Sequence, residues 1–288
     1  MLGISQRDRI GTEAAEAIAA EGSYEVYFGM GHVLRLLNRP DVFKVSPAGM
    51  SLGDFLVRDL TQDDLRGSLL DMGTGSGALA ILLRGLGAHD ITATDISASA
   101  VKTAMENELL NFGDQRISFG EGSLFDGPRT KRRFDLIVFN PPGWHSPSEE
   151  CREELKRQNL RGLNLSAMFS GEKVAFDFLR QLPHHLTSNG RAIVGLNSMI
   201  GIRSVLSRIR ELDGVGDALE FKLIERHTFP LFFYSGDWRE SRDILLTEFH
   251  RWRDRHGIAF SVSDDGTLYW SYEVIECRLA AKFREVRA

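Results

Sequence analysis

The stretch LLDMGTGSGALAILL, residues 69–83, runs from an apolar segment through an aspartate into three glycines and a second apolar segment. This order predicts a buried strand, a tight turn and a helix. Gly73, Gly75 and Gly77 stand two apart, and glycine is needed where a backbone comes so close to a ligand that a Cβ atom would collide with it. The stretch therefore predicts a nucleotide-like ligand on this turn, and the rest of the chain must identify it.

On both sides of this turn, patterns typical of strands and helices alternate. Strand patterns lie at residues 67–72, 90–95, 116–122, 133–140, 190–197 and 219–226. Helix patterns lie at residues 76–86, 97–112, 171–186 and 202–212. This alternation predicts an α/β fold with a mostly parallel, seven-stranded sheet and helices on both faces. Segments 257–263 and 269–280 flank the turn sequence DDGT and predict an antiparallel strand pair at the C-terminal end.

The composition is that of an ordinary globular protein. The 288 residues are 42% hydrophobic and 26% charged, and the net charge of −5 leaves no overall basic footprint for nucleic acid. Cys151 and Cys277 form no CxxC pair, so we expect a reducing, cytoplasmic location. The sequence contains no run of about 18 apolar residues, so no membrane span is predicted. His145, His184 and His185 have no partners at metal-ligand spacing, so no metal site is predicted.

Asp71 and Asp95 distinguish between the cofactors that such a turn can bind. The glycine spacing fits both a dinucleotide and S-adenosylmethionine. A carboxylate at Asp71, at the end of the first strand, would attract the ammonium group of S-adenosylmethionine and repel the pyrophosphate of a dinucleotide. Asp95 ends the next strand, where an acid can accept hydrogen bonds from ribose hydroxyls. Alternatively, Asp71 caps the following helix, and Asp95 interacts with the dipole of the helix that Ser97 caps.

Asn140, Pro141 and Pro142 directly follow the apolar strand pattern FDLIVF. Open α/β sheets bind ligands at the carboxyl ends of their strands. The Asn140 side chain and the Pro141 backbone each offer a carbonyl, so together they can accept two hydrogen bonds from one substrate NH₂ group and position its nitrogen. The motif therefore favours chemistry on nitrogen. The alternative is a turn that only ends the strand.

Taken together, these residues resemble a known family. Asp71 with the three glycines, then Asp95, then Asn140-Pro141-Pro142 is similar to the class I S-adenosylmethionine-dependent methyltransferases. More narrowly, the chain resembles the branch with an N-P-P-[YF] motif, which includes release-factor glutamine, ribosomal-RNA and amine N-methyltransferases. The similarity spans residues 43–197. It implies a Rossmann-like methyltransferase fold, S-adenosyl-L-methionine as the cofactor, and N-methylation as the reaction.

The resemblance implies a role for each residue of the cofactor site. The methionyl end is expected against Asp71 and the three glycines, the ribose against Asp95, and the adenine against Ile96. Ser123 and Leu124 are also expected in the cofactor site. Ser123 stands where the family often has an aspartate that binds the adenine amine, and its hydroxyl is a weaker acceptor.

The resemblance also implies the contacts of the methyl acceptor. Asn140, which is expected to touch the cofactor as well, and Pro141 should face the target nitrogen. Pro142, Gly143 and Trp144 are the expected substrate contacts. The family has Tyr or Phe at the position of Gly143, where it stacks on a planar target, whereas Trp144 comes one residue late. Recognition of a planar base is therefore not expected, and Gly143 is expected to enlarge the space near the methyl group.

An acidic cluster follows the motif and predicts the class of substrate. Glu149, Glu150, Glu153 and Glu154 could attract a cation, so we expect a small polar amine or guanidine as the substrate and nucleic acid as an unlikely one. The alternative for the cluster is a solvated helix start favoured by the helix dipole. Two other functions remain open, namely a protein glutamine or ribosomal-RNA N-methyltransferase and a non-catalytic scaffold that only binds the cofactor.

Two domains are expected. Residues 1–60 are predicted to form a helical segment that recognises substrate or acts as a lid, with helices at 12–20 and 24–37. Residues 61–288 are predicted to form the Rossmann-like domain. The aromatic stretch at 226–240 is a second candidate for the lid, or alternatively part of the core.

Overall fold

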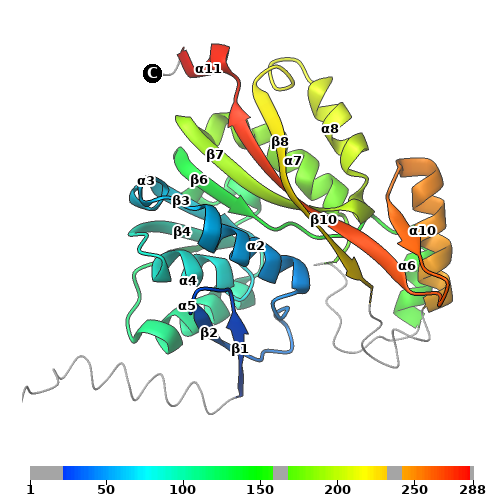
Figure 1. Ribbon diagram of the computed structural model, residues 1–288, viewed down its shortest axis with the longest axis horizontal. Coiled ribbons are helices and arrows are strands. Elements are labelled where there is room, and N and C mark those ends of the chain that lie inside the picture. Colours follow the sequence, from blue (N-terminus) through cyan, green and yellow to red (C-terminus); the bar gives the residue numbers. More distant parts are fainter. Residues whose placement is uncertain (1–21, 158–167, 232–241, 286–288) are drawn as a thin grey trace, which may run out of the picture. The chain divides into compact units, whose positions relative to one another are not determined.

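The computed structural model describes residues 22–157, 168–231 and 242–285 (Figure 1). Its strands are β1 Ser23–Tyr27, β2 Val33–Leu37, β3 Ser68–Met72, β4 Asp90–Asp95, β5 Ser118–Glu121, β6 Phe134–Phe139, β7 Leu186–Asn197, β8 Leu219–Pro230, β9 Phe260–Val262 and β10 Leu268–Leu279. Its α-helices are α2 Pro47–Asp59, α3 Gln62–Arg66, α4 Ala78–Gly85, α5 Ala98–Phe112, α6 Glu149–Arg157, α7 Gly171–His185, α8 Ile202–Arg210, α10 Arg242–His256 and α11 Ala281–Glu285. The expected helix at 12–20 and residues 232–240 of the aromatic stretch lie outside the described ranges.

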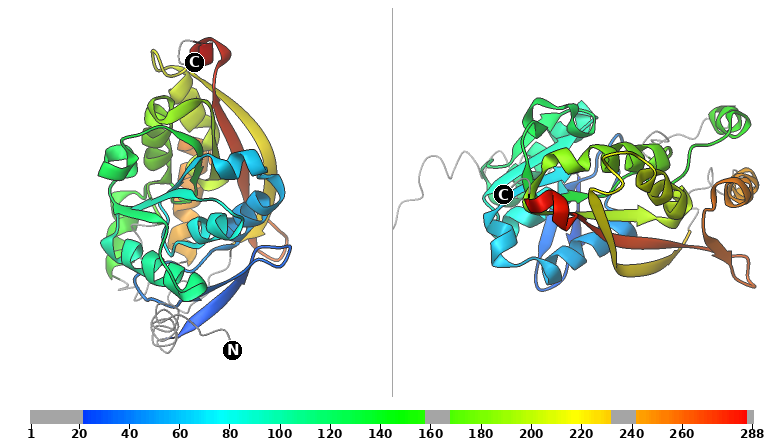
Figure 2. Two further views of the ribbon diagram at one scale, coloured as in Figure 1. Left: turned by 90° about the vertical axis from the view of Figure 1, so that its left-hand side faces the viewer. Right: turned by 90° about the horizontal axis from the view of Figure 1, so that it is seen from above.

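One large sheet organises the fold. Its strand order is β5-β4-β3-β6-β7-β10-β8, and β9 pairs with β10 as an eighth strand. β3 pairs parallel with β4 and β6, and β4 pairs parallel with β5. β10 pairs antiparallel with β9, as the DDGT turn predicts, and also with β8 along its length (Figure 2). The expected α/β class with an antiparallel C-terminal pair is confirmed, and the pairing of β10 with β8 adds to it.

The described residues form two compact units. The first contains residues 22–140 and 184–193, and the second contains residues 141–157, 168–183, 194–231 and 242–285. This division differs from the predicted boundary at residue 60. It falls directly after Asn140 and again within β7, so both units take strands from the same sheet. Within the described ranges, no helix is both long and apolar enough to cross a membrane.

The core of the first unit surrounds β3, β4 and β6. Leu69, Leu70, Ala93, Leu136 and Ile137 are all buried, as is typical of parallel strands that are covered on both faces. α4 is buried over residues 78–83, because nearly every side chain in this helix is apolar. The helix that follows β4 is α5, and Ser97 caps it by accepting a hydrogen bond from the Ala100 N–H at 3.3 Å. The predicted cap is thereby confirmed.

The predicted helix at residues 24–37 is wrong, because this segment is a β-hairpin. β1 and β2 pair antiparallel from Ser23 opposite Leu37 to Tyr27 opposite Val33. Gly29 and Gly31 both have a positive φ in the connecting turn, which an α-helix cannot accommodate. In the same turn Met30 has a φ of 48°, which is unusual for a residue other than glycine. The only helix longer than one turn between residues 22 and 60 is α2, so the expected all-helical N-terminal segment is also wrong for its described part.

Candidate active site

The register of the strands in the first unit brings three predicted site residues together, namely Gly73, Asp95 and Asn140. Met72 on β3 lies opposite Thr94 on β4 and opposite Phe139 on β6. The next residues along the three strands are Gly73, Asp95 and Asn140. All three therefore leave the sheet side by side at its carboxyl edge, where open α/β sheets bind ligands.

Each glycine of the turn has a positive φ, and each meets a different environment. A Cβ atom on Gly77 would lie 2.8 Å from the Cβ of Ala104, so this glycine lets the turn pack against α5. A Cβ on Gly73 would lie 3.3 Å from the ring of Phe139. A Cβ on Gly75 would meet nothing within 4 Å. The open side of the turn is therefore at Gly75.

Asp71 is buried, with a relative exposure of 1%, and its carboxylate is tied to the turn and to α4. Its Oδ2 accepts hydrogen bonds from the Thr74 hydroxyl at 2.6 Å and from the Ala80 N–H at 3.1 Å. Helix capping, the alternative reading of the sequence, is thus one role of this residue. Burial raises the pKa of Asp71 to about 7, opposed by these two hydrogen bonds and assisted by the charge of Asp95. A cationic ligand would favour the ionised form.

Asp95 connects β4 to the glycine turn. Its Oδ2 accepts a hydrogen bond from the Gly75 N–H at 2.8 Å, and its Oδ1 accepts one from the Ser97 N–H at 2.9 Å. Each carboxylate oxygen has a second lone pair, so these bonds orient the group without exhausting it. The next residue, Ile96, is 71% exposed, which is unusual for so large an apolar side chain and fits one that a bound ring would cover.

The other two predicted cofactor residues follow β5. Ser123 is exposed and precedes the 3-10 helix Leu124–Asp126, without a hydrogen bond from its side chain to that helix. Leu124 has a φ of 47°, a strained conformation for leucine. Such strain gathers at ligand sites, although it proves no role by itself. The roles of Ser123 and Leu124 remain predictions.

The β-hairpin supports the glycine turn, which the sequence did not indicate. The Tyr24 hydroxyl accepts a hydrogen bond from the Val45 N–H at 3.1 Å and forms a second one with the Ser76 side chain. Burial raises the pKa of Tyr24. Asn107 on α5 donates to the Ser76 carbonyl at 2.8 Å and accepts from the Leu37 N–H at 2.8 Å. A buried asparagine in the middle of a predicted helix was the signal that could have revealed this link.

In the second unit, the residues after Asn140 are packed more tightly than expected. A Cβ on Gly143 would lie 2.8 Å from Nδ2 of Asn197, and a Cβ on Gly171 would collide with the Pro142 carbonyl. Two backbone bonds hold the loop, from the Trp144 N–H to the Met168 carbonyl at 2.9 Å and from the Gly171 N–H to the Trp144 carbonyl at 2.8 Å. The expectation that Gly143 enlarges an open space is wrong, because Asn197 fills that side.

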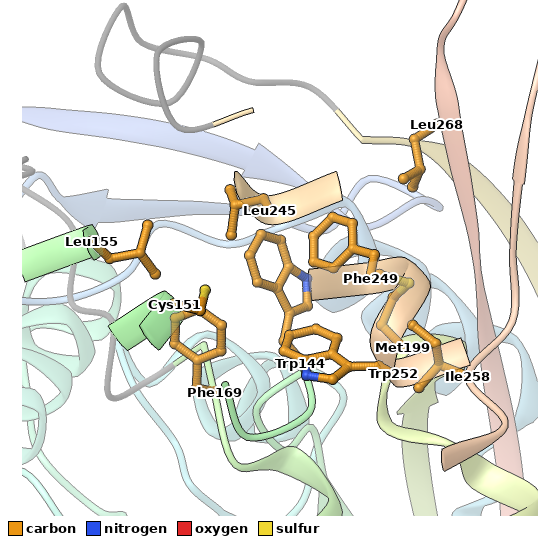
Figure 3. Packing of buried hydrophobic residues seen from close by; sticks show 10 residues of the cluster. All are labelled: Trp144, Cys151, Leu155, Phe169, Met199, Leu245, Phe249, Trp252, Ile258 and Leu268. Atoms are coloured by element: carbon orange, nitrogen blue, oxygen red, sulfur yellow. The ribbon is translucent and has the colours of Figure 1, made fainter. Parts of the chain in front are cut away.

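Trp144 is part of a hydrophobic cluster and is only 6% exposed (Figure 3). Its ring lies edge-on to Phe169 at 5.5 Å and to Phe249 at 5.2 Å between centroids. The other members of the cluster are Cys151, Leu155, Met199, Leu245, Trp252, Ile258 and Leu268. Trp144 therefore anchors the loop, and this position does not support the predicted contact of Trp144 with substrate.

Three of the four acids of α6 lie close to arginines, and of these Glu149 and Glu150 are exposed whereas Glu154 is half-buried. Glu149 lies 3.7 Å from Arg152, and Glu150 lies 3.6 Å from Arg251. Such surface pairs leave little net negative charge to attract a substrate. The geometry thus agrees with the alternative of a solvated helix start. Among the described residues, no group of three His, Cys, Asp or Glu side chains is arranged to hold a metal ion.

The residues of the first unit fit S-adenosylmethionine. The turn is open at Gly75, a buried carboxylate with a raised pKa lies under it, and an exposed isoleucine follows a carboxylate at the neighbouring strand end. The buried carboxylate suits an ammonium, the carboxylate at the neighbouring strand end suits a ribose, and the exposed isoleucine suits an adenine ring. Asp71, Asp95 and Ile96 are the residues that would hold these three parts.

Comparisons with known proteins agree with this fit. A family model for ribosomal protein L11 methyltransferase (PrmA) matches residues 55–141. Over 179 residues the chain is 30% identical to a Methanocaldococcus jannaschii protein that is provisionally named a protein N5-glutamine methyltransferase, covering 62% of this chain and 84% of that protein. It is 34% identical over 145 residues to the release factor glutamine methyltransferase of Rhodopirellula baltica, covering 49% of this chain and 48% of the relative. The chain thus spans about half the length of this bacterial relative.

A solved structure shares the fold. A provisionally assigned methyltransferase complexed with SAH matches 88% of this chain and 56% of its own, with a TM-score of 0.52 and 14% sequence identity. At this identity the likeness concerns the fold alone.

The relatives correct the predicted substrate. Their names describe methylation of proteins, namely a release factor, a ribosomal protein and protein glutamine. The expected small-molecule amine or guanidine is therefore wrong, in agreement with the arginine-paired acids of α6. The protein-glutamine alternative is the one that agrees with these names. The chain belongs to the class I S-adenosylmethionine-dependent methyltransferases, in the branch of the protein N5-glutamine methyltransferases.

Proposed function

We propose that this protein transfers a methyl group from S-adenosylmethionine to the side-chain amide nitrogen of a glutamine in a protein. The observation that carries the proposal is the position of Asn140. It leaves β6 beside Gly73 and Asp95, at the edge of the sheet where we expect the cofactor to bind. The names of the relatives support glutamine as the acceptor.

A carboxamide nitrogen is a weak nucleophile, because its lone pair is delocalised into the carbonyl group. Its two N–H groups are the hydrogen-bond donors through which a protein can orient it. In the proposed complex, the Asn140 side-chain carbonyl and the Pro141 backbone carbonyl accept one hydrogen bond each from the amide. These bonds turn one face of the nitrogen toward the methyl group and hold it there, an orientation effect that can contribute several orders of magnitude to a rate.

Packing around Asn140 supports this positioning role. A Cβ on Gly49 of α2 would lie 3.6 Å from Nδ2 of Asn140, so the absence of a side chain at residue 49 leaves room for the amide. Pro141 and Pro142 stiffen the next two positions, because their rings fix φ. When bound, S-adenosylmethionine supplies an electrophilic methyl group on a sulfonium. Transfer of this methyl group to the amide nitrogen would yield the N-methyl amide, the neutral thioether SAH and one proton.

The test uses labelled cofactor and three acceptor pools. The protein is incubated with S-adenosylmethionine labelled in the methyl group and with synthetic glutamine-containing peptides, a fraction of ribosomal proteins and release factors, or ribosomal RNA. Label is expected in protein or peptide. Acid hydrolysis of the product should release labelled methylamine, because an N-methyl amide is cleaved whereas methylated lysine and arginine are not degraded in this way.

Peptides in which glutamate replaces the glutamine are the matched controls and should remain unlabelled. Label in RNA alone would contradict the proposal, as would label that acid hydrolysis leaves on lysine or arginine.

A further inference from the structure

A cavity in the second unit has no role in the function described so far. Its volume is about 310 Å³, and its polar lining consists of His145, Glu172, Lys173, Ser204, Arg208 and His256. These residues come from the loop after Pro142, from the first turns of α7 and α8, from the last turn of α8, and from the end of α10.

The one carboxylate of the cavity is already engaged. Glu172 is only 6% exposed, and its two oxygens accept hydrogen bonds from the Ser146 N–H at 3.0 Å and the Ser146 hydroxyl at 2.6 Å. His145 lies 3.8 Å from the same carboxylate. Glu172 therefore serves the loop that carries Ser146, and its acceptors are not directed to a ligand.

The cations of the cavity differ in this respect. Among the described residues, neither Lys173 nor Arg208 forms an ion pair, whereas Arg180, on the same helix as Lys173, lies 3.5 Å from Asp177. The guanidinium of Arg208 lies 4.1 Å over the Phe176 ring, which orients it and leaves its donors available. Lys173 and Arg208 are both exposed, so their charged groups are accessible to a ligand.

The helix ends at the cavity have opposing effects, so the cations carry the argument. The rings of His145 and His256 stack at 4.1 Å, and burial together with the charge of His145 lowers the pKa of His256. α7 and α8 both begin at the cavity, where a first turn favours an anion, whereas the last turns of α8 and α10 also line it and oppose this effect. Lys173 and Arg208 therefore supply the cationic groups of the cavity.

The cavity adjoins the loop that follows the Asn-Pro-Pro motif. Gly171 precedes the lining residues Glu172 and Lys173, and a Cβ on it would collide with the Pro142 carbonyl. Its N–H donates to the Trp144 carbonyl, and the His145 N–H donates to the Met199 carbonyl at 3.2 Å. Residues of the cavity lining are thus joined to the loop that begins at Pro141.

We propose that this cavity binds a carboxylate side chain of the polypeptide substrate, close in sequence to the methylated glutamine. The proposal rests on the proposed function, since it presumes a polypeptide acceptor. A single carboxylate suits the two exposed cations Lys173 and Arg208.

The experiment compares synthetic peptides that carry one central glutamine. The parent peptide has alanine and glycine flanks, and its variants carry one glutamate, or one lysine, at each flanking position in turn. Binding is measured by fluorescence anisotropy with SAH at saturation, and methylation is measured in parallel. We expect at least one glutamate position to lower the Kd about tenfold, which corresponds to about 1.4 kcal/mol.

Three protein variants make this test specific. In Lys173→Ala/Arg208→Ala the ratio of the two Kd values should fall to near one. In the control Arg180→Ala/Arg203→Ala, which removes the same charge from α7 and α8 outside the cavity lining, the ratio should stay at about ten. Lys173→Glu should shift the preference from the glutamate peptide toward the lysine peptide. This reversal could not result from loss of folding.

The outcomes separate the cavity from the proposed function. If glutamate peptides bind more tightly and the cavity variant abolishes this, but no peptide or protein is methylated on glutamine, the cavity stands and the proposed function falls. If glutamine is methylated without any preference for glutamate, or with a preference that survives Lys173→Ala/Arg208→Ala, the cavity proposal is overturned. Displacement of the glutamate peptide by an RNA oligonucleotide, but not by excess unlabelled glutamate peptide, would overturn it as well.

Discussion

The glycine turn of the first unit and the loop of residues 141–146 in the second unit are built differently. The turn is positioned by the register of adjacent parallel strands, so Gly73, Asp95 and Asn140 come together wherever the sheet forms. The loop is held by distant segments, through the carbonyls of Met168 and Met199. Strand order thus determines the first region, and tertiary packing determines the second.

The glycines show the same difference. Gly75 has a positive φ and faces open space, so its requirement is conformational. Gly143 and Gly171 have no positive φ, and their requirement is steric, because Asn197 and the Pro142 carbonyl fill the positions that a Cβ would need. A glycine beside a motif is therefore no sign of space for a ligand until its neighbours are known. The predictions below test this contrast.

The largest effect is expected at Asn140, the last residue before the boundary between the units. Asn140→Ala should lower turnover about 100-fold, because the target nitrogen loses its orientation. Affinity for SAH should hardly change, since Asp71 and Asp95 keep their hydrogen bonds. Steady-state kinetics and calorimetry check the two halves of this expectation.

Asn111→Ala is the control for Asn140, because this asparagine of the same unit bonds only to backbone groups of Arg35 and Asn107. Its turnover should stay close to that of the unchanged protein. A wild-type rate in Asn140→Ala would refute the proposal that Asn140 positions the target amide.

The second prediction compares two glycines of one turn. Gly77→Ala should lower the free energy of unfolding by about 2 kcal/mol, because the left-handed backbone and the contact with Ala104 both oppose a Cβ. Gly75→Ala should lower it by about 1 kcal/mol, from the backbone alone. Denaturant unfolding measures both values.

Binding of SAH should show the opposite order, with Gly75→Ala weaker than Gly77→Ala, since the open side of the turn is where a ligand would lie. Equal losses of stability together with unchanged binding in Gly75→Ala would contradict the assignment of that open side.

The third prediction concerns Gly143. Gly143→Ala should destabilise the fold by about 1–2 kcal/mol, because its Cβ would overlap Asn197. Asn197→Ala should lessen this cost, so the double variant should lose less stability than the sum of the single variants. Thermal unfolding of the four proteins forms the required cycle. Strict additivity would show that the close contact is not the reason for glycine at this position.

The sequence predicted the first unit well because its signals are local. A few adjacent residues are enough to predict each of β3, β4, β6 and the cap at Ser97. The order of the strands then places Gly73, Asp95 and Asn140 together. The hairpin at 23–37 was missed because its apolar spacing also fits a helix, although Gly29 and Gly31 mark a turn. The apolar spacing alone does not distinguish a hairpin from a helix, whereas the two glycines of the turn do.

The second unit could not be predicted in the same way. The partners of Trp144 lie between residues 151 and 268, and no local pattern connects them. The acids of α6 were interpreted as a cation-attracting cluster, because the sequence of α6 does not show that Arg251 of α10 lies beside Glu150. Likewise, Tyr24 and Asn107 contact Ser76 from distant positions. Each of these contacts depends on which elements pack together, and the sequence of one element does not contain that information.

The last prediction concerns the protonation of Asp71. Its pKa is about 7 in the folded protein against an ordinary value of 3.8, so the folded state holds a proton more tightly than the unfolded state does. The stability due to this proton is therefore fully present below about pH 4 and is lost as the pH rises through 7. Asp71→Asn should remove this part of the pH dependence, which unfolding measurements between pH 4 and pH 8 can detect.

Ligand binding should depend on pH in the opposite direction, and this distinguishes a cofactor contact from a helix cap. An ammonium ligand prefers the ionised carboxylate, so affinity for SAH should rise about tenfold from pH 6 to pH 8, as the ionised fraction of a group with a pKa near 7 does. Asp71→Asn should abolish the rise, whereas Asp63→Asn, at an exposed acid of α3, should preserve it. A pH-independent affinity in the unchanged protein would leave Asp71 with its capping role alone, through Thr74 and Ala80.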